Sequence, residues 1–136
     1  MVGAGRPHGV LLDTNVVIAA FNREGEARER IEESPAGSLF VPIIVLGELR
    51  FGARKSGRVE ENLRKIEAFA AASDVLPCDE ATARLHGDVK ADLRRKGRPI
   101  PENDIWISAT ALQHDLTIAT RDPHFDHVEG LRTERW

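Results

Sequence analysis

Four acidic residues stand next to strongly apolar sequence rather than on solvated faces. Asp13 follows Val-Leu-Leu, Glu48 lies within IIVLGELRFG, Asp104 begins DIWISATAL, and Asp122 comes just after LTIAT. A carboxylate is costly to bury unless hydrogen bonds or a cation compensate its charge. Several carboxylates in one pocket repel one another, and a divalent cation removes that repulsion. Oxygen ligands favour Mg²⁺, with Mn²⁺ as the alternative, over Zn²⁺.

Each acid also has a purely structural interpretation. Asp13 could cap a helix, and Asp104 could be a first-turn acid favoured by the helix dipole. Asp122 could open a turn before the next proline, and Glu48 could pair with a basic neighbour on its own helix. Four independent acids of this kind need not gather at one edge of a fold, so their joint pattern favours a site.

The elements that must position these acids are short apolar runs alternating with helical patterns. Strands are expected at 10–12, 39–41, 75–76, 116–120 and 131–135. A first helix is expected to start near 13–15 and to run past Phe21, and further helices are expected at 23–33, 43–54, 59–72 and 80–96, with a last helix opening at Asn103 or Asp104. Phe51 is expected to face inward, and the segment RDPHFDHVEG is expected to be a loop.

Strands that alternate with helices predict an α/β fold with a mainly parallel sheet of about four or five short strands, covered on both faces. Ligands of such sheets bind at the carboxyl ends of the strands. Asp13 follows the first expected strand and Asp122 the fourth, so both are placed at one edge of the sheet.

Length and composition indicate one globular domain over residues 1–136, with residues 1–9 as a flexible leader or the product of a misassigned start. Cys78 is the only cysteine, which favours a reducing, cytoplasmic location. The first residues lack the apolar segment of a secretory signal, and no membrane span is expected. A formal net charge of −3 means that any nucleic acid must be held by a local basic face.

Four segments carry a family resemblance: LLDTNVVIAAF, IIVLGELRFGA, PENDIWISATAL and IATRDPHFDHVEGL. They resemble the signature segments of PIN-domain ribonucleases, above all the VapC-type toxins of toxin–antitoxin systems. The resemblance covers nearly the whole chain and implies a PIN-like three-layer α/β/α fold. It also implies catalytic, metal-binding acids with polar support, namely Asp13, Glu48, Asp104 and Asp122, supported by Asn15 and Thr120.

The resemblance implies a Mg²⁺- or Mn²⁺-dependent endoribonuclease in which metal-activated water cleaves RNA, leaving a 5′-phosphate and a 3′-hydroxyl. Asp13 and Asp104 would be the main ligands of the first metal ion, and Glu48 and Asp122 would complete the cluster. The resemblance also implies a small VapB-like antitoxin as partner, and a homodimer. The antitoxin is expected on exposed apolar surface along 16–21 and 43–51.

Basic residues beside the acids are the candidates for binding RNA phosphates, although cations are also ordinary at helix ends. They form two runs: Arg50, Arg54, Lys55 and Arg58, and then Arg94, Arg95, Lys96 and Arg98. An aromatic fraction of 5% without tyrosine does not favour a platform for base stacking.

Other functions remain open at the level of sequence. His124, His127 and Asp126 suggest a zinc site, and the paired histidines suggest metal-free RNA cleavage. A DxD-type phosphatase would need an aspartate where Asn15 stands. A housekeeping RNA-processing nuclease is the nearest alternative within the enzymes, and a non-catalytic RNA- or protein-binding module is the alternative outside them.

Overall fold

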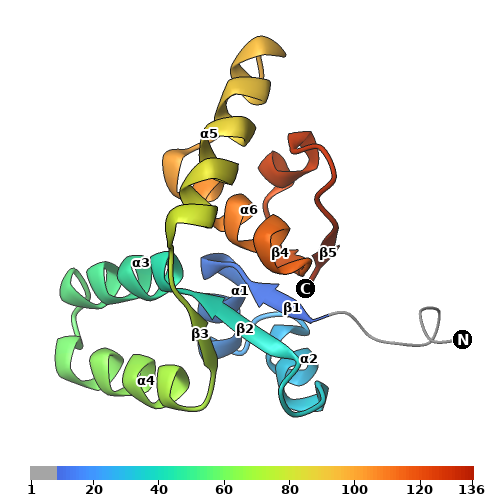
Figure 1. Ribbon diagram of the computed structural model, residues 1–136. Helices are drawn as coiled ribbons and strands as arrows, with labels where there is room; N and C mark the ends of the chain where they lie inside the picture. The colour runs from blue at the N-terminus through green and yellow to red at the C-terminus, as the bar shows by residue number, and fades with distance from the viewer. Residues whose placement is uncertain (1–8) are drawn as a thin grey trace, which may run out of the picture.

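A parallel five-stranded sheet forms the centre of the computed structural model, which describes residues 9–136 (Figure 1). The expected leader therefore lies outside the described residues, except for Gly9. The strands are β1 (Val10–Leu12), β2 (Leu39–Pro42), β3 (Asp74–Leu76), β4 (Thr117–Thr120) and β5 (Thr133–Arg135). The flanking helices are α1 (Thr14–Phe21), α2 (Ala27–Glu33), α3 (Ile43–Arg54), α4 (Val59–Ala71), α5 (Glu80–Arg95) and α6 (Glu102–His114), and a short 3₁₀ helix, η1, spans Pro123–His127.

The order of the strands across the sheet is β3-β2-β1-β4-β5. The chain thus proceeds from β1 through β2 to β3 in one direction, and β4 and β5 then add on the other side of β1. The carboxyl ends of β1 and β4 lie next to each other where the winding direction changes. Ligands bind at such a switch point in open α/β sheets.

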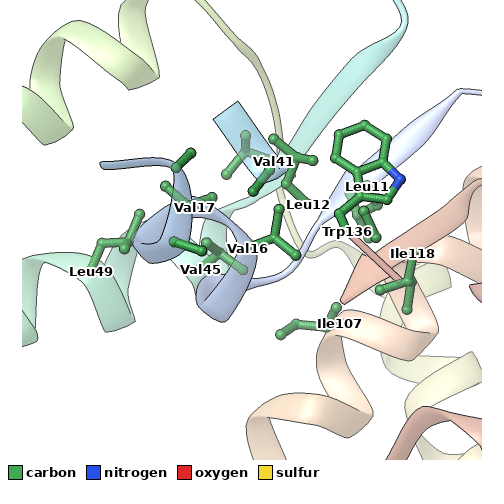
Figure 2. Packing of buried hydrophobic residues seen from close by; sticks show 14 of the residues in the cluster. Leu11, Leu12, Val16, Val17, Val41, Val45, Leu49, Ile107, Ile118 and Trp136 are labelled. Atoms are coloured by element: carbon green, nitrogen blue, oxygen red, sulfur yellow. The ribbon is translucent and has the colours of Figure 1, made fainter. Parts of the chain in front are cut away.

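The sheet is covered on both faces. Leu11 and Leu12 are neighbours in β1, and Ile118 and Ala119 are neighbours in β4, yet all four are fully buried. Neighbouring residues of a strand point to opposite faces, so apolar side chains must cover both. Figure 2 shows this core, in which side chains of α1, α3 and α6 pack with those of β1 and β4. The expected α/β class and parallel sheet are confirmed.

Three local predictions were wrong. The helix expected at 23–33 begins only at Ala27, because Arg23 and Gly25 adopt positive φ angles of 57° and 65° that interrupt helical geometry. The segment expected to be a loop after β4 contains η1, with Pro123 at its start. Phe51 points outward and is 64% exposed, because α3 packs through Val45, Leu49 and Ala53 instead.

Smaller differences concern the ends of elements. The last helix opens at Glu102, one residue before the earlier of its two expected starts. The strands expected at 116–120 and 131–135 are shorter, at Thr117–Thr120 and Thr133–Arg135. Within the described residues, no helix combines the length and apolar character that crossing a membrane requires.

Candidate active site

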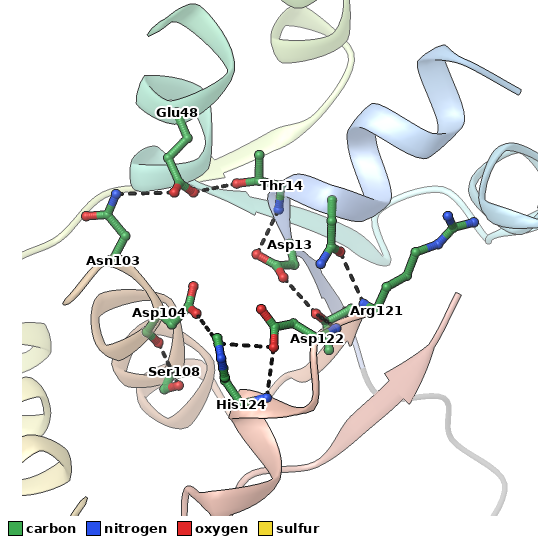
Figure 3. A network of polar contacts seen from close by, with 11 residues as sticks. Asp13, Thr14, Glu48, Asn103, Asp104, Ser108, Arg121, Asp122 and His124 are labelled. Atoms are coloured by element: carbon green, nitrogen blue, oxygen red, sulfur yellow. Dashed lines mark hydrogen bonds and ion pairs between the residues drawn. The ribbon is translucent and has the colours of Figure 1, made fainter. Parts of the chain in front are cut away.

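The four acids predicted from the sequence come together at the carboxyl edge of the sheet (Figure 3). Asp13 directly follows β1 and caps α1, and Asp122 follows β4 and caps η1. Glu48 comes from the middle of α3, and Asp104 from the first turn of α6. Four segments that lie far apart in the sequence therefore supply one acidic cluster.

Asp13 is the most buried of the four, with only 5% of its surface exposed. Its carboxylate accepts hydrogen bonds from the Thr120 hydroxyl at 2.7 Å and from the Thr14 backbone N–H at 2.8 Å. Burial nevertheless raises the pKa of Asp13 to about 6, with smaller contributions from the negative charges of Asp104 and Glu48. The protein alone thus compensates this charge incompletely.

Glu48 is held by two side chains that sequence reasoning did not single out. The Thr14 hydroxyl donates to one carboxylate oxygen of Glu48, and the Asn103 side-chain amide donates to the other at 3.2 Å. Each donor directly neighbours a predicted acid in the sequence, Thr14 after Asp13 and Asn103 before Asp104. That adjacency was the one signal that could have identified them.

Asp104 and Asp122 meet at the ring of His124. The Nδ1 atom of His124 lies 3.0 Å from Asp122 Oδ1 and 3.3 Å from Asp104 Oδ2. Burial raises the pKa of Asp104, and the Asp122 carboxylate adds to this, while the hydrogen bond from His124 opposes it. The sequence analysis expected only oxygen atoms in the cluster, so the imidazole nitrogen is an addition that the structure reveals.

The two predicted supporting residues act differently. Thr120 holds the carboxylate of Asp13 and also accepts the backbone N–H of Asp122 at 2.9 Å. Asn15 instead accepts the backbone N–H of Arg121 at 3.1 Å, which ties the start of α1 to the segment after β4. Thr120 thus supports Asp13 and Asp122 directly, whereas Asn15 fixes the backbone of Arg121, the residue before Asp122.

The donor set fits a divalent cation. Within residues 9–136, no lysine or arginine lies within 4 Å of a carboxylate oxygen of any of the four acids. The ligand atoms of Asp104, Asp122 and His124 all lie within 4.8 Å of one another, close enough to share one ion. Partly desolvated carboxylates without a lysine or arginine partner suit a divalent cation, which binds oxygen ligands and offsets their mutual repulsion.

The zinc site suggested by His124, Asp126 and His127 is not formed. Among the described residues, the one group of three or more possible ligands close enough to hold an ion consists of Asp104, Asp122 and His124. Asp126 and His127 do not join it, although they follow His124 closely in η1.

Several of the cations expected to contact RNA already have partners. Arg50 pairs with Glu67 at 3.5 Å, Lys55 lies over the Phe51 ring, and Arg95 and Lys96 both pair with Asp92. Arg54 and Arg94 have no acidic partner within the described part of the chain. RNA binding by these residues remains a prediction.

An apolar groove adjoins the acidic cluster between α1, α3 and α4. Ile18 and Phe21 of α1, Leu49 of α3 and Ile66 of α4 line it, and Glu48 also contributes to its wall. Ile18 is 43% exposed, although it is a large aliphatic residue. The expected exposed apolar surface on 16–21 and 43–51 is therefore present, although Val16 and Val17 are buried in the core.

Comparisons with known proteins agree on one family. Residues 10–131 match the PIN domain. The chain is 39% identical over 128 residues to the tRNA(fMet)-specific endonuclease VapC of Shigella flexneri, covering 93% of this chain and 96% of that protein. It is 37% identical, with the same coverage, to Ribonuclease VapC2 of Haemophilus influenzae. The crystal structure of DNA-bound VapBC from Salmonella typhimurium superposes with a TM-score of 0.87 at 32% identity, covering 96% of this chain and 99% of that chain.

Proposed function

The chain belongs to the VapC family of PIN-domain ribonucleases, and on that premise we propose that it is the endoribonuclease toxin of a toxin–antitoxin pair. The reaction is metal-dependent hydrolysis of RNA phosphodiester bonds. The observation that supports this most strongly is the convergence of Asp13, Glu48, Asp104 and Asp122 at the switch point of the sheet. Within residues 9–136, no lysine or arginine forms an ion pair with any of these four carboxylates.

The four acids are proposed to hold Mg²⁺ or Mn²⁺. When bound, such an ion supplies a polarised water as nucleophile and neutralises charge on the phosphate. Asp13 and Asp104 are the proposed principal ligands, because both are partly desolvated and both have raised pKa values. Glu48 and Asp122 complete the cluster by direct binding or by orienting water.

The neighbouring polar residues keep the acids in place. Thr120 fixes one oxygen of Asp13 and the backbone at Asp122. Thr14 of α1 and Asn103 of α6 each donate a hydrogen bond to a different carboxylate oxygen of Glu48. This support matters because a catalytic group displaced by even about 1 Å can lose about a hundredfold in rate.

The proposed substrate is RNA bound through its phosphates. Initiator tRNA is the first RNA to test, because the Shigella relative is named as a tRNA(fMet)-specific endonuclease. Arg54, Arg94 and Arg98 are the candidate cations to test first, since none of them forms an ion pair with an acid within the described residues.

The proposed partner is a small VapB-like antitoxin, which the related crystal structures contain as VapBC complexes. An amphipathic segment of the antitoxin would lie in the groove of Ile18, Phe21, Leu49 and Ile66. Glu48 belongs to the same groove wall, so a partner bound there reaches the acidic cluster. We also propose a single domain over residues 1–136, a homodimer and a cytoplasmic location.

The test is cleavage of initiator tRNA by the purified chain with Mg²⁺ or Mn²⁺, with EDTA, and with the Asp104→Asn variant. We expect cleavage that stops with EDTA and falls at least a hundredfold in Asp104→Asn. Analysis of the product ends separates this mechanism from cleavage by the histidines. Metal-dependent hydrolysis leaves a 5′-phosphate, whereas attack by the 2′-hydroxyl leaves a cyclic phosphate.

Cleavage that survives EDTA, or full activity in a folded Asp104→Asn variant, would contradict the proposal. Products ending in a cyclic phosphate would favour the metal-free histidine mechanism instead. Absence of cleavage on any RNA, with normal binding of a partner protein, would favour a non-catalytic module.

A further inference from the structure

We infer that His124 is a nitrogen ligand of the metal site and makes this site prefer Mn²⁺ and similar transition metals over Mg²⁺. The inference rests on the proposed function, which requires a divalent ion at the acidic cluster. It concerns a residue that the sequence patterns placed in a loop beside the site rather than in it.

The position of the ring supports this assignment. Nδ1 of His124 lies 3.0 Å from Asp122 Oδ1 and 3.3 Å from Asp104 Oδ2 (Figure 3). In an octahedral site with bonds of about 2.1 Å, neighbouring ligand atoms lie about 3.0 Å apart. The nitrogen thus lies at the spacing of a neighbouring ligand from each carboxylate oxygen, and all three atoms lie within 4.8 Å of one another.

One imidazole N–H cannot satisfy both carboxylates equally well. Nδ1 carries at most one hydrogen, and that hydrogen can point directly at only one acceptor. Asp104 and Asp122 also repel each other, and this repulsion adds to burial, the larger cause of the raised pKa of Asp104. A divalent cation among the three atoms satisfies all of them at once, since an unprotonated Nδ1 then donates its lone pair.

The backbone holds His124 in this position. Asp122 caps η1 and accepts the backbone N–H of His124 at 2.9 Å, and Pro123 fixes the first residue of the turn. The next residue, Phe125, is fully buried and anchors η1 in the core. The ring is therefore carried by a rigid segment, although 45% of the side chain is exposed.

The mixed donor set determines the expected preference. Mg²⁺ binds oxygen ligands almost exclusively, whereas first-row transition metals also bind imidazole nitrogen, Mn²⁺ the most weakly of them. Two carboxylates with one imidazole should therefore gain affinity for Mn²⁺ relative to a cluster of carboxylates alone. Mg²⁺ should gain little from the same nitrogen.

The experiment measures metal binding by the full chain without RNA. Wild type, His124→Ala and His127→Ala are titrated with Mn²⁺, followed by the electron paramagnetic resonance signal of the free ion, and Mg²⁺ is measured by competition. His127→Ala is the matched control, because His127 ends the same η1 and contacts Lys96 only through its backbone oxygen. Pulsed resonance of the bound Mn²⁺ then reports coupling to a ligand nitrogen, and ¹⁵N-labelled histidine identifies that nitrogen as imidazole.

We expect wild type and His127→Ala to show the imidazole coupling and His124→Ala to lose it. Affinity for Mn²⁺ should fall about tenfold in His124→Ala, while affinity for Mg²⁺ changes less than about twofold. The coupling in wild type tests the inference even if His124→Ala does not fold.

Two results would overturn the inference, and they are distinguishable. Mn²⁺ bound by wild type without imidazole coupling would show that His124 only neighbours the ion, and the proposed function would stand. Wild type that binds neither Mn²⁺ nor Mg²⁺ at millimolar concentrations would overturn the inference and the proposed function together.

Discussion

At the scale of single residues, Asp13 links the chemistry of the site to the stability of the fold. Burial raises its pKa to about 6, well above the ordinary value of 3.8. The folded protein therefore binds a proton at Asp13 more tightly than the unfolded chain does. Without metal, the free energy of unfolding therefore falls as the pH rises from about 4 to about 6. Above about pH 6, the folded protein carries the full cost of burying the charged carboxylate.

The first prediction is that the metal-free protein becomes more stable when the pH is lowered from 7 to 5. For Asp13 alone the gain between these two pH values is about 1.3 kcal/mol, because between pH 7 and 5 the folded protein takes up nearly one proton at Asp13 that the unfolded chain does not. Asp104 contributes with the same sign, because its pKa is also raised. Urea unfolding in EDTA at both pH values measures the change.

The control for this prediction is Asp13→Asn, which removes the titrating group and leaves all others. The difference in the free energy of unfolding between pH 7 and pH 5 should be smaller in the variant than in wild type. Acids with lowered pKa values, Asp79, Asp92 and Glu102, act in the opposite direction but only near and below pH 4. An equal pH response in wild type and variant would mean that Asp13 is solvated.

The second prediction concerns Asp104→Asn and metal. Added Mg²⁺ at ten times its dissociation constant should stabilise wild type by roughly 1.4 kcal/mol, and the variant by much less. In EDTA the two proteins should be nearly equal. Removal of a repelling charge is then offset by the loss of up to ~1 kcal/mol of attraction to the helix dipole. Thermal melts with Mg²⁺ and with EDTA measure both effects, and equal Mg²⁺-induced shifts would remove Asp104 from the ligands.

At the scale of elements, Arg121 joins three segments around the site. Its guanidinium donates to the backbone oxygen of Trp136 and to that of Glu24, each at 2.9 Å. Its backbone N–H is accepted by Asn15 of α1. The turn between α1 and α2, the start of α1 and the end of the sheet are thereby fixed to the residue that precedes Asp122.

The third prediction uses Gly25, which lies against this arginine. Gly25 has a φ of +65°, and a Cβ placed there would lie 2.5 Å from Arg121 Nη2. Gly37 has a φ of +79° with no neighbouring atom within 4 Å. Both changes to alanine should cost about 1 kcal/mol for the left-handed backbone.

Gly25→Ala should cost more than Gly37→Ala, because Arg121 must also move and its hydrogen bonds weaken. Chemical denaturation of both variants gives the difference. In an Arg121→Ala background, Gly25→Ala should cost no more stability than Gly37→Ala, since the obstructing side chain is then absent. Equal losses in the two glycine variants would show that Arg121 adapts freely.

At the scale of the whole molecule, the groove beside the site predicts how a partner binds. The fourth prediction is that Ile18→Ser weakens binding of the cognate antitoxin at least tenfold, because Ile18 lines the groove. Ile43→Ser is the matched control, since Ile43 is equally exposed at 44% but does not line the groove. Calorimetric titration of both variants measures the effect, and equal weakening would place the antitoxin elsewhere.

Much of the fold could be predicted from the sequence because its central strands lie in short runs rich in apolar residues. Val10–Leu12 and Thr117–Thr120 stand out for this reason, and an acid follows each at the edge of the sheet. The interrupted start of α2 was missed because Arg23, which is not a glycine, adopts a positive φ. Phe51 was misplaced because apolar character alone does not tell a buried helical face from an exposed one.

The acids of the candidate site could be predicted where an acid interrupts apolar sequence, whereas contacts between distant segments could not. Glu48 is bound by Thr14 and Asn103, which lie 34 and 55 residues away in the chain. His124 was considered only for zinc or for metal-free cleavage, because its contact with Asp104 depends on how η1 is placed against α6. Such contacts follow from tertiary packing rather than from local pattern.

The strand order β3-β2-β1-β4-β5 also divides the protein into two contiguous halves. Residues before Cys78 supply β1, β2, β3 and the acids Asp13 and Glu48, and those after it supply β4, β5, Asp104 and Asp122. Within the sheet, the two halves are joined by the pairing of β1 with β4. A chain divided near Cys78 would give two fragments that each lack half of the acids, so RNA cleavage would report their reassembly, as in fragment complementation.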